Sequence, residues 1–310
     1  THDSLDSWIP PSSVTLYQIA GWGADTVSGI DFYDEQKVLG ITVGHKRLYR
    51  PVFVEDGDGV VPVPSALMTN AATNVHNYWL DLRAIGEQLK LDYDHGNIFE
   101  SESTRRFVKS KFLLGEEPVD FVTTYSPSKE QSSKKLIFQL HSPLTLGLYD
   151  ASGNYTGLNS DGSVSKEVAG VTYGEFGDVK YIIAPAGTQY ELAMNGQTDG
   201  VFSLDIQEQT GNSLTTTTIA DVPTTSTTVA RLTITNGAFD ASALSVDSDG
   251  DGTEDFAVTI ESGETVQYTE PITVSEETKE TQSGSISTKN YVQSIPSIAI
   301  PAFTLSLIHI

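Results

Sequence analysis

Two short segments in the first third of the chain place acid–base side chains next to glycine. The first, PVFVEDGDGVVP at residues 51–62, puts Asp56 and Asp58 between glycines at the end of an apolar run. Glycine permits the tight turn that leaves an acid exposed at the carboxyl edge of a strand, where open α/β sheets assemble their sites. On an extended strand both aspartates point the same way, so the pattern makes each of them a candidate acid.

The second segment, DYDHGN at residues 92–97, puts His95 beside glycine in a polar loop. An apolar, strand-like run at 75–82 precedes this loop, and a helical stretch at 103–114 follows it. An acid at one strand end and a histidine on the next loop can meet in space and exchange a proton. We therefore predict that the acid turn and His95 form one site. The plain alternative is an ordinary turn and a solvated histidine.

These motifs belong to a region of mixed α/β character, residues 1–115. The strand-like runs of this region lie at 14–20, 51–54 and 75–82. In the helix expected at 103–114, Val108 and Phe112 are four residues apart and are predicted to form its apolar face. Strand, acid turn, strand, histidine loop and terminal helix follow in that order.

After Gly115 the helical periodicity disappears, and short alternating runs appear between turn signals. This pattern of short alternating runs predicts an all-β sandwich domain at 116–212. The threonine-rich run at 213–228 is interpreted as a flexible linker or, equally, as an exposed edge strand, because threonine also favours strands. A second β-domain is predicted at 213–304. Residues 305–310 match one reading frame of a common sequencing adaptor and are expected to be a non-native tail.

A third motif, DSDGDGTED at residues 247–255, has carboxylates at alternate positions around glycines. Such carboxylates converge on one hard cation, so the spacing predicts a structural calcium site. Val258 stands where an EF-hand has its bidentate glutamate, which predicts weak affinity and a likeness to the isolated calcium loops of extracellular β-rich modules. The candidate ligands are Asp247, Asp249, Asp251, the carbonyl of Thr253, and Asp255.

Composition excludes several partners. The 310 residues carry a net charge of −23, from 41 acidic and 18 basic residues, and such a field repels nucleic acid. The chain has no cysteine, so disulfide and thiolate chemistry are absent. Its most apolar segment, 294–310, is interrupted by Pro296 and Pro301, so no transmembrane segment is expected. The acidic, threonine-rich surface favours a secreted or cell-surface protein, and no organic cofactor is implied.

The first third of the chain resembles the closing portion of α/β-hydrolase lipases, with the lecithin:cholesterol acyltransferase-like enzymes and related microbial lipases as the nearest subgroup. The likeness rests on GDGVVP at 57–62 followed by Ser65-Ala66, on His95-Gly96 before a terminal helix, and on the upstream YQIAGWG at 17–23. The resemblance implies an α/β-hydrolase C-terminal fragment followed by β-sandwich domains. It also implies an ester or lipid substrate.

Within that resemblance Asp58 matches the family's triad acid, because it lies four places before the motif's proline, and Asp56 is the alternate. His95 matches the triad base. In this fold the nucleophile precedes the acid and the histidine in the chain and lies in G-x-S-x-G, a motif that this sequence lacks. We therefore expect the nucleophile upstream of Thr1, and the chain as given to be inactive on esters.

Two other functions remain open on the sequence. The β-rich part and its calcium loop are also typical of an extracellular binding or adhesion module, in which the α/β segment would carry no catalysis. A peptidase or thioesterase can use the same triad, because the acid and histidine do not identify the acyl group. The sequence does not indicate an oligomeric state.

Overall fold

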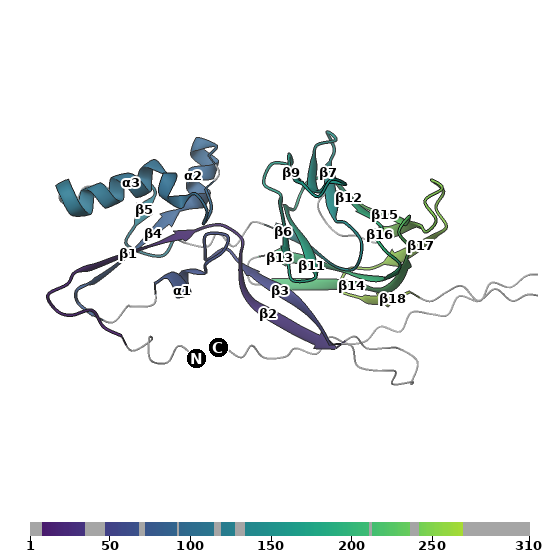
Figure 1. Ribbon diagram of the computed structural model, residues 1–310, viewed down its shortest axis with the longest axis horizontal. Helices are drawn as coiled ribbons and strands as arrows, with labels where there is room; N and C mark the ends of the chain where they lie inside the picture. Colours follow the sequence, from purple (N-terminus) through teal and green to yellow (C-terminus); the bar gives the residue numbers. More distant parts are fainter. Residues whose placement is uncertain are drawn as a thin grey trace, which may run out of the picture. The chain divides into compact units, whose positions relative to one another are not determined.

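The computed structural model is dominated by strands, and the chain divides into two compact units, Thr1–Glu130 and Gln131–Ile310 (Figure 1). The structure describes residues 8–34, 47–67, 72–91, 93–114, 119–127, 134–210, 213–235 and 242–268. The tail predicted at 305–310, the apolar segment 294–310 and the end of the second predicted β-domain lie outside these residues. No helix of the described part is long and apolar enough to cross a membrane.

A small sheet organises the first unit. Strand β1 (Leu16–Trp22) runs parallel to β4 (Val75–Asp81), and the short β5 (Val122–Thr123) pairs with β4 on its other side. Parallel neighbours need a long crossover connection, and here the connection carries an antiparallel hairpin. That hairpin consists of β2 (Thr26–Asp34) and β3 (Arg47–Val54), and it leads directly into the acid turn.

Helices cover both faces of this sheet, as a parallel pair of strands requires. Ala20 of β1 packs with α1 (Val63–Ala66), whereas its neighbour Ile19 packs with α2 (Leu82–Leu89). Successive strand residues point to opposite faces, so α1 and α2 lie on opposite sides of the sheet (Figure 1). The mixed α/β character predicted for this region is present. The pairing of β5 also shows that the first unit extends past the expected boundary at residue 115.

The terminal helix differs from its prediction. It consists of a 3₁₀ turn (Ile98–Glu100), α3 (Glu102–Lys109) and a π-helical turn (Ser110–Leu114). The side chain predicted to face the core, Phe112, is 74% exposed, and Phe107 is buried instead. The ring of Phe107 packs 4.7 Å from that of Tyr78 on β4. The predicted apolar face was wrong because one aromatic contact, rather than the i, i+4 pair, fixes the rotation of the helix.

The second unit is a β-sandwich of two sheets, with strand orders β10-β11-β6-β13-β14-β18 and β17-β16-β15-β12-β7-β8-β9 (Figure 1). Its strands are β6 (Lys134–His141), β7 (Gly147–Asp150), β8 (Tyr155–Leu158), β9 (Val164–Lys166), β10 (Thr172–Phe176), β11 (Val179–Pro185), β12 (Tyr190–Asn195), β13 (Gly200–Thr210), β14 (Ser213–Thr224), β15 (Val229–Ile234), β16 (Ser242–Asp247), β17 (Phe256–Ile260) and β18 (Thr265–Gln267). The all-β sandwich expected from the alternating pattern is therefore present.

The boundary expected at 212/213 falls inside this sandwich. Strand β13 pairs with β14 across it, and β12 pairs with β15. One continuous hydrophobic core runs from Leu136 to Ile260 and draws on both sheets. The threonine-rich run forms most of β14, which lies between β13 and β18, so it is neither a linker nor an edge strand among the described strands. The physical reason is that β-branched threonine suits an internal strand.

A mutant pair tests whether this sandwich unfolds as one unit. Leu140 on β6 and Leu244 on β16 are both fully buried in the shared core, although they lie on opposite sides of residue 212. We expect Leu140→Ala and Leu244→Ala each to lower the free energy of unfolding of the same transition by about 2–5 kcal/mol. Guanidinium unfolding, followed by far-UV circular dichroism of its strands, measures this, because all three tryptophans of the chain lie in the first unit. Thr233→Ala, at an exposed position on β15, is the control. Two transitions that each respond to one mutation would contradict a single sandwich.

Candidate acid–base and metal sites

Asp58 and His95 form a hydrogen-bonded pair in the first unit. The distance between His95 Nδ1 and Asp58 Oδ2 is 2.9 Å. The Asp58 side chain is 10% exposed, whereas the His95 side chain is 49% exposed. A buried carboxylate on one ring nitrogen fixes the orientation of an imidazole, and it leaves the other nitrogen for proton transfer. The structure therefore brings together the acid turn and the histidine loop, as predicted.

Backbone groups fix the carboxylate of Asp58. Its second oxygen, Oδ1, accepts hydrogen bonds from the N–H groups of Val60, at 3.1 Å, and Val61, at 2.7 Å. The carboxylate thus acts as an acceptor on both oxygens. Nδ1 of His95 therefore carries the proton of the shared hydrogen bond, and in the neutral ring Nε2 becomes the basic nitrogen.

The main chain around Asp58 is also tied to both of its neighbours. The N–H of His95 donates to the carbonyl of Asp58 at 2.8 Å. On the other side Ala24, just after β1, forms a parallel bridge with Asp58, and its N–H donates to the carbonyl of Gly57 at 3.1 Å. The turn is therefore held between the end of β1 and the histidine loop.

Asp56, the alternate acid, has a different position. Its Oδ1 is buried and has no hydrogen-bond partner among the residues that the structure describes. Its carbonyl accepts the N–H of Val63 at the start of α1, at 2.8 Å. The carboxylate on His95 is that of Asp58, so the geometry distinguishes two aspartates that the sequence pattern left equivalent.

Three polar contacts that were not predicted from the sequence support the site. Asp94 accepts the N–H of Gly96 at 2.8 Å, and its own N–H donates to the side chain of Asn97, also at 2.8 Å. These bonds shape the loop around His95, and the pattern Asp-x-Gly-Asn is a turn signal that could have revealed them. Arg83 of α2 pairs with Glu55 beside the acid turn, a contact between residues far apart in sequence.

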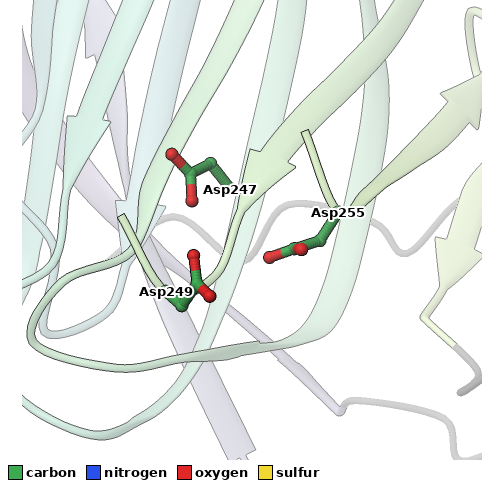
Figure 2. Close-up of side chains that lie close together, drawn as sticks. All are labelled: Asp247, Asp249 and Asp255. Carbon is green, nitrogen blue, oxygen red and sulfur yellow. The ribbon is translucent and has the colours of Figure 1, made fainter. Parts of the chain in front are cut away.

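The second site lies in the loop between β16 and β17. Carboxylate oxygens of Asp247, Asp249 and Asp255 all lie within 4.8 Å of one another, and Figure 2 shows the three side chains converging. Calcium binds oxygen at about 2.3–2.6 Å, so two ligand oxygens of one ion can be at most about 5 Å apart. The spacing and the all-oxygen donor set therefore fit a calcium ion.

Backbone and hydroxyl groups position these carboxylates. The two oxygens of Asp247 accept the N–H groups of Gly250, at 2.7 Å, and Gly252, at 2.8 Å. Asp255 accepts both the hydroxyl and the N–H of Ser248, and these bonds lower the pKa of its carboxyl below the usual value. Asp255 is therefore charged at neutral pH.

One of the predicted carboxylate ligands lies outside this group. Asp251 is not among the three clustered carboxylates, and its side chain accepts the N–H of Thr253 at 2.7 Å. The alternate spacing predicted all three members of the cluster, but it also included Asp251. Glycine turns at Gly250 and Gly252, with φ of 77° and 90°, break the regular alternation at that point.

Comparison of the chain with protein families, with curated proteins and with solved structures finds no match. The chemical interpretation therefore rests on the two sites themselves. The Asp58–His95 pair can move a proton at Nε2, the ring nitrogen that Asp58 does not bind, and the loop carboxylates can hold a hard cation.

A glycine of β1 provides a test of the acid–histidine geometry. A Cβ on Gly21 would lie 2.7 Å from Cβ of Asp58 and 2.9 Å from Cδ1 of Ile98. We expect Gly21→Ala to displace the acid turn, to weaken the His95 hydrogen bond and to lower stability by about 1–3 kcal/mol. Chemical denaturation and the His95 ring resonances in NMR spectra measure both effects.

Gly29→Ala is the matched control, because a Cβ there meets no atom within 4 Å. It should change stability by less than about 0.5 kcal/mol. If Gly21→Ala behaves like Gly29→Ala in both measurements, the close approach of β1 to Asp58 does not constrain the site.

Proposed function

We propose that the first unit is the closing part of a serine ester hydrolase, a lipase or esterase of the α/β-hydrolase type. Asp58 is its triad acid and His95 its general base. The observation that carries the proposal is the 2.9 Å contact between His95 Nδ1 and Asp58 Oδ2, with the acid buried and the histidine half exposed. The parallel pairing of β1 and β4 and the helices on both faces of the sheet add support, since this is α/β architecture.

In this mechanism each group has one task. The Nδ1–H bond to Asp58 selects the tautomer in which Nε2 is basic. Nε2 then takes the proton of a serine hydroxyl as that oxygen attacks the ester carbonyl, and later gives the proton to the departing alcohol. The buried carboxylate of Asp58 stabilises the imidazolium that forms in between.

The nucleophile in this proposal precedes β1. Chain order in this fold is nucleophile, acid, histidine, and the sequence contains no G-x-S-x-G. The substrate class is an ester, with lipid esters first; thioesters and peptides share the triad chemistry and remain alternatives. We further propose an extracellular or cell-surface location, because the surface is strongly acidic and free of cysteine.

Activity of a longer chain tests the proposal. The coding sequence is extended upstream in frame until it includes a G-x-S-x-G serine, and the product is assayed on p-nitrophenyl esters. We expect His95→Ala and Asp58→Asn each to lower kcat by about 10⁴-fold or more, because both groups act on the same proton. Asp56→Asn is the matched control, and its kcat should stay within a few-fold of the unmutated enzyme.

Either of two results would overturn this proposal. One is a reading frame that begins close to Thr1 with no room for a serine-bearing strand. The other is an active long chain whose kcat is insensitive to His95→Ala.

A second candidate function rests on the loop in the sandwich. The convergence of Asp247, Asp249 and Asp255 favours a calcium-stabilised, β-rich binding or adhesion module at the cell exterior. The ion would offset two of the three negative charges and tie together the ends of β16 and β17. This role is structural, so a hydrolase with the same ion in its sandwich is compatible with it.

Calcium titration tests the metal site. At 10 mM calcium and an affinity of about 10⁻⁴–10⁻³ M, we expect the sandwich to gain about 1.5–3 kcal/mol and its Tm to rise by several degrees. Asp249→Asn should abolish most of this gain. Asp251→Asn removes the same charge from the same loop outside the cluster, and should keep most of it. A Tm that does not respond to millimolar calcium would exclude the site.

A further inference from the structure

A buried threonine joins β1 to the acid turn. Thr26, the first residue of β2, is 0% exposed. Its hydroxyl donates a hydrogen bond to the carbonyl of Ala24 at 2.8 Å and accepts one from the N–H of Gly59 at 2.8 Å. One side chain therefore connects the residues that follow β1 with the residue directly after Asp58.

The same side chain also packs against the residue directly before Asp58. A Cβ built on Gly57 would lie 2.4 Å from Thr26 Oγ1 and 2.8 Å from its Cγ2. The side chain of Thr26 thus occupies the space that a side chain at position 57 would need, so Gly57 and Thr26 pack closely. Asp58 is held on one side by this packing and on the other by the Gly59 hydrogen bond.

The hydroxyl matters because of how Asp58 is oriented. Its Oδ1 is fixed by the N–H groups of Val60 and Val61, so the path of the turn decides where Oδ2 points. Gly59 has a φ of 97°, a left-handed conformation that glycine adopts without strain, and its N–H donates to Thr26. Only a side chain that both donates and accepts can satisfy the Ala24 carbonyl and the Gly59 N–H together.

We propose that Thr26 is a positioning residue for the acid–histidine pair: its hydroxyl fixes the turn 57–61 so that Asp58 Oδ2 meets His95 Nδ1. This inference rests on the proposed function, through the Asp58–His95 pair. The described hydrogen bonds of the Thr26 hydroxyl go to Ala24 and Gly59, not to His95, so its proposed role acts through the acid.

NMR of the chain as it exists tests this role without needing the nucleophile. With ¹⁵N-histidine labelling, the His95 Nδ1–H proton reports directly on the bond to Asp58. We expect a slowly exchanging Nδ1–H in the unmutated chain and, in Thr26→Val, exchange at least about tenfold faster, because the turn is released while the side-chain shape is kept. Thr26→Ser restores the hydroxyl and should stay within about twofold of the original rate.

Thr156→Val is the matched control. Thr156 is also fully buried and its hydroxyl also accepts a backbone N–H, that of Val168, but it lies in the sandwich. It should leave the His95 proton unchanged. If Thr26→Val fails to fold by circular dichroism, Thr26→Ala is compared with Thr26→Ser instead, and the same difference is expected.

The outcomes separate the two hypotheses. A protected Nδ1–H that persists unchanged in the variants without the hydroxyl overturns the role of Thr26 and leaves the pair intact. An unmutated chain with no Nδ1–H bonded to a carboxylate overturns the pair, and with it the proposed function. Loss of protection in Thr26→Ser, with protection kept in Thr26→Val, would assign the effect to the methyl group and overturn the hydroxyl mechanism.

Discussion

The hydrogen bond between Asp58 and His95 joins residues 37 positions apart, and the parallel pairing of β1 with β4 makes it possible. Parallel neighbours end at the same edge of a sheet, so the segments that follow them emerge side by side. The register aligns the last residues of the two strands, Trp22 and Asp81. The acid turn then folds back onto Ala24, while α2 leads to the histidine loop. The arrangement of β1, β4 and α2 therefore places the acid turn next to the histidine loop.

Part of this site can be predicted from sequence. Glycine-flanked carboxylates after an apolar run, followed by a histidine-glycine loop, indicate the two segments that meet. The sequence pattern does not decide whether Asp56 or Asp58 contacts His95, because residues two apart on a strand point to the same side. The decision comes from a turn in which Asp58 receives two backbone N–H bonds and Asp56 receives none that is described. Thr26 was missed because the N–H that its hydroxyl accepts belongs to Gly59, 33 residues away, and the local sequence does not indicate such a contact.

In the sandwich, too, local sequence predicts the strands but not which strands pair. Alternating runs predicted the all-β sandwich, since the period of two depends on each strand's own residues. Strand partners depend on the whole sheet, so the boundary drawn at residue 212 separated β13 from β14, which pair along most of their lengths. Helix α3 is a smaller case: Val108 and Phe112 share one face, yet the aromatic contact of Phe107 with Tyr78 places a different face against the sheet.

The carboxylates of the β16–β17 loop repel one another, and their hydrogen bonds offset part of this repulsion. Like charges a few ångströms apart repel, and the net charge of −23 adds to this repulsion. N–H groups of Gly250 and Gly252 offset the charge of Asp247, and Ser248 does the same for Asp255. Those bonds also lower the pKa of Asp255, so protonation does not relieve the repulsion at neutral pH. A divalent cation bound between the converging oxygens, as proposed above, would relieve it.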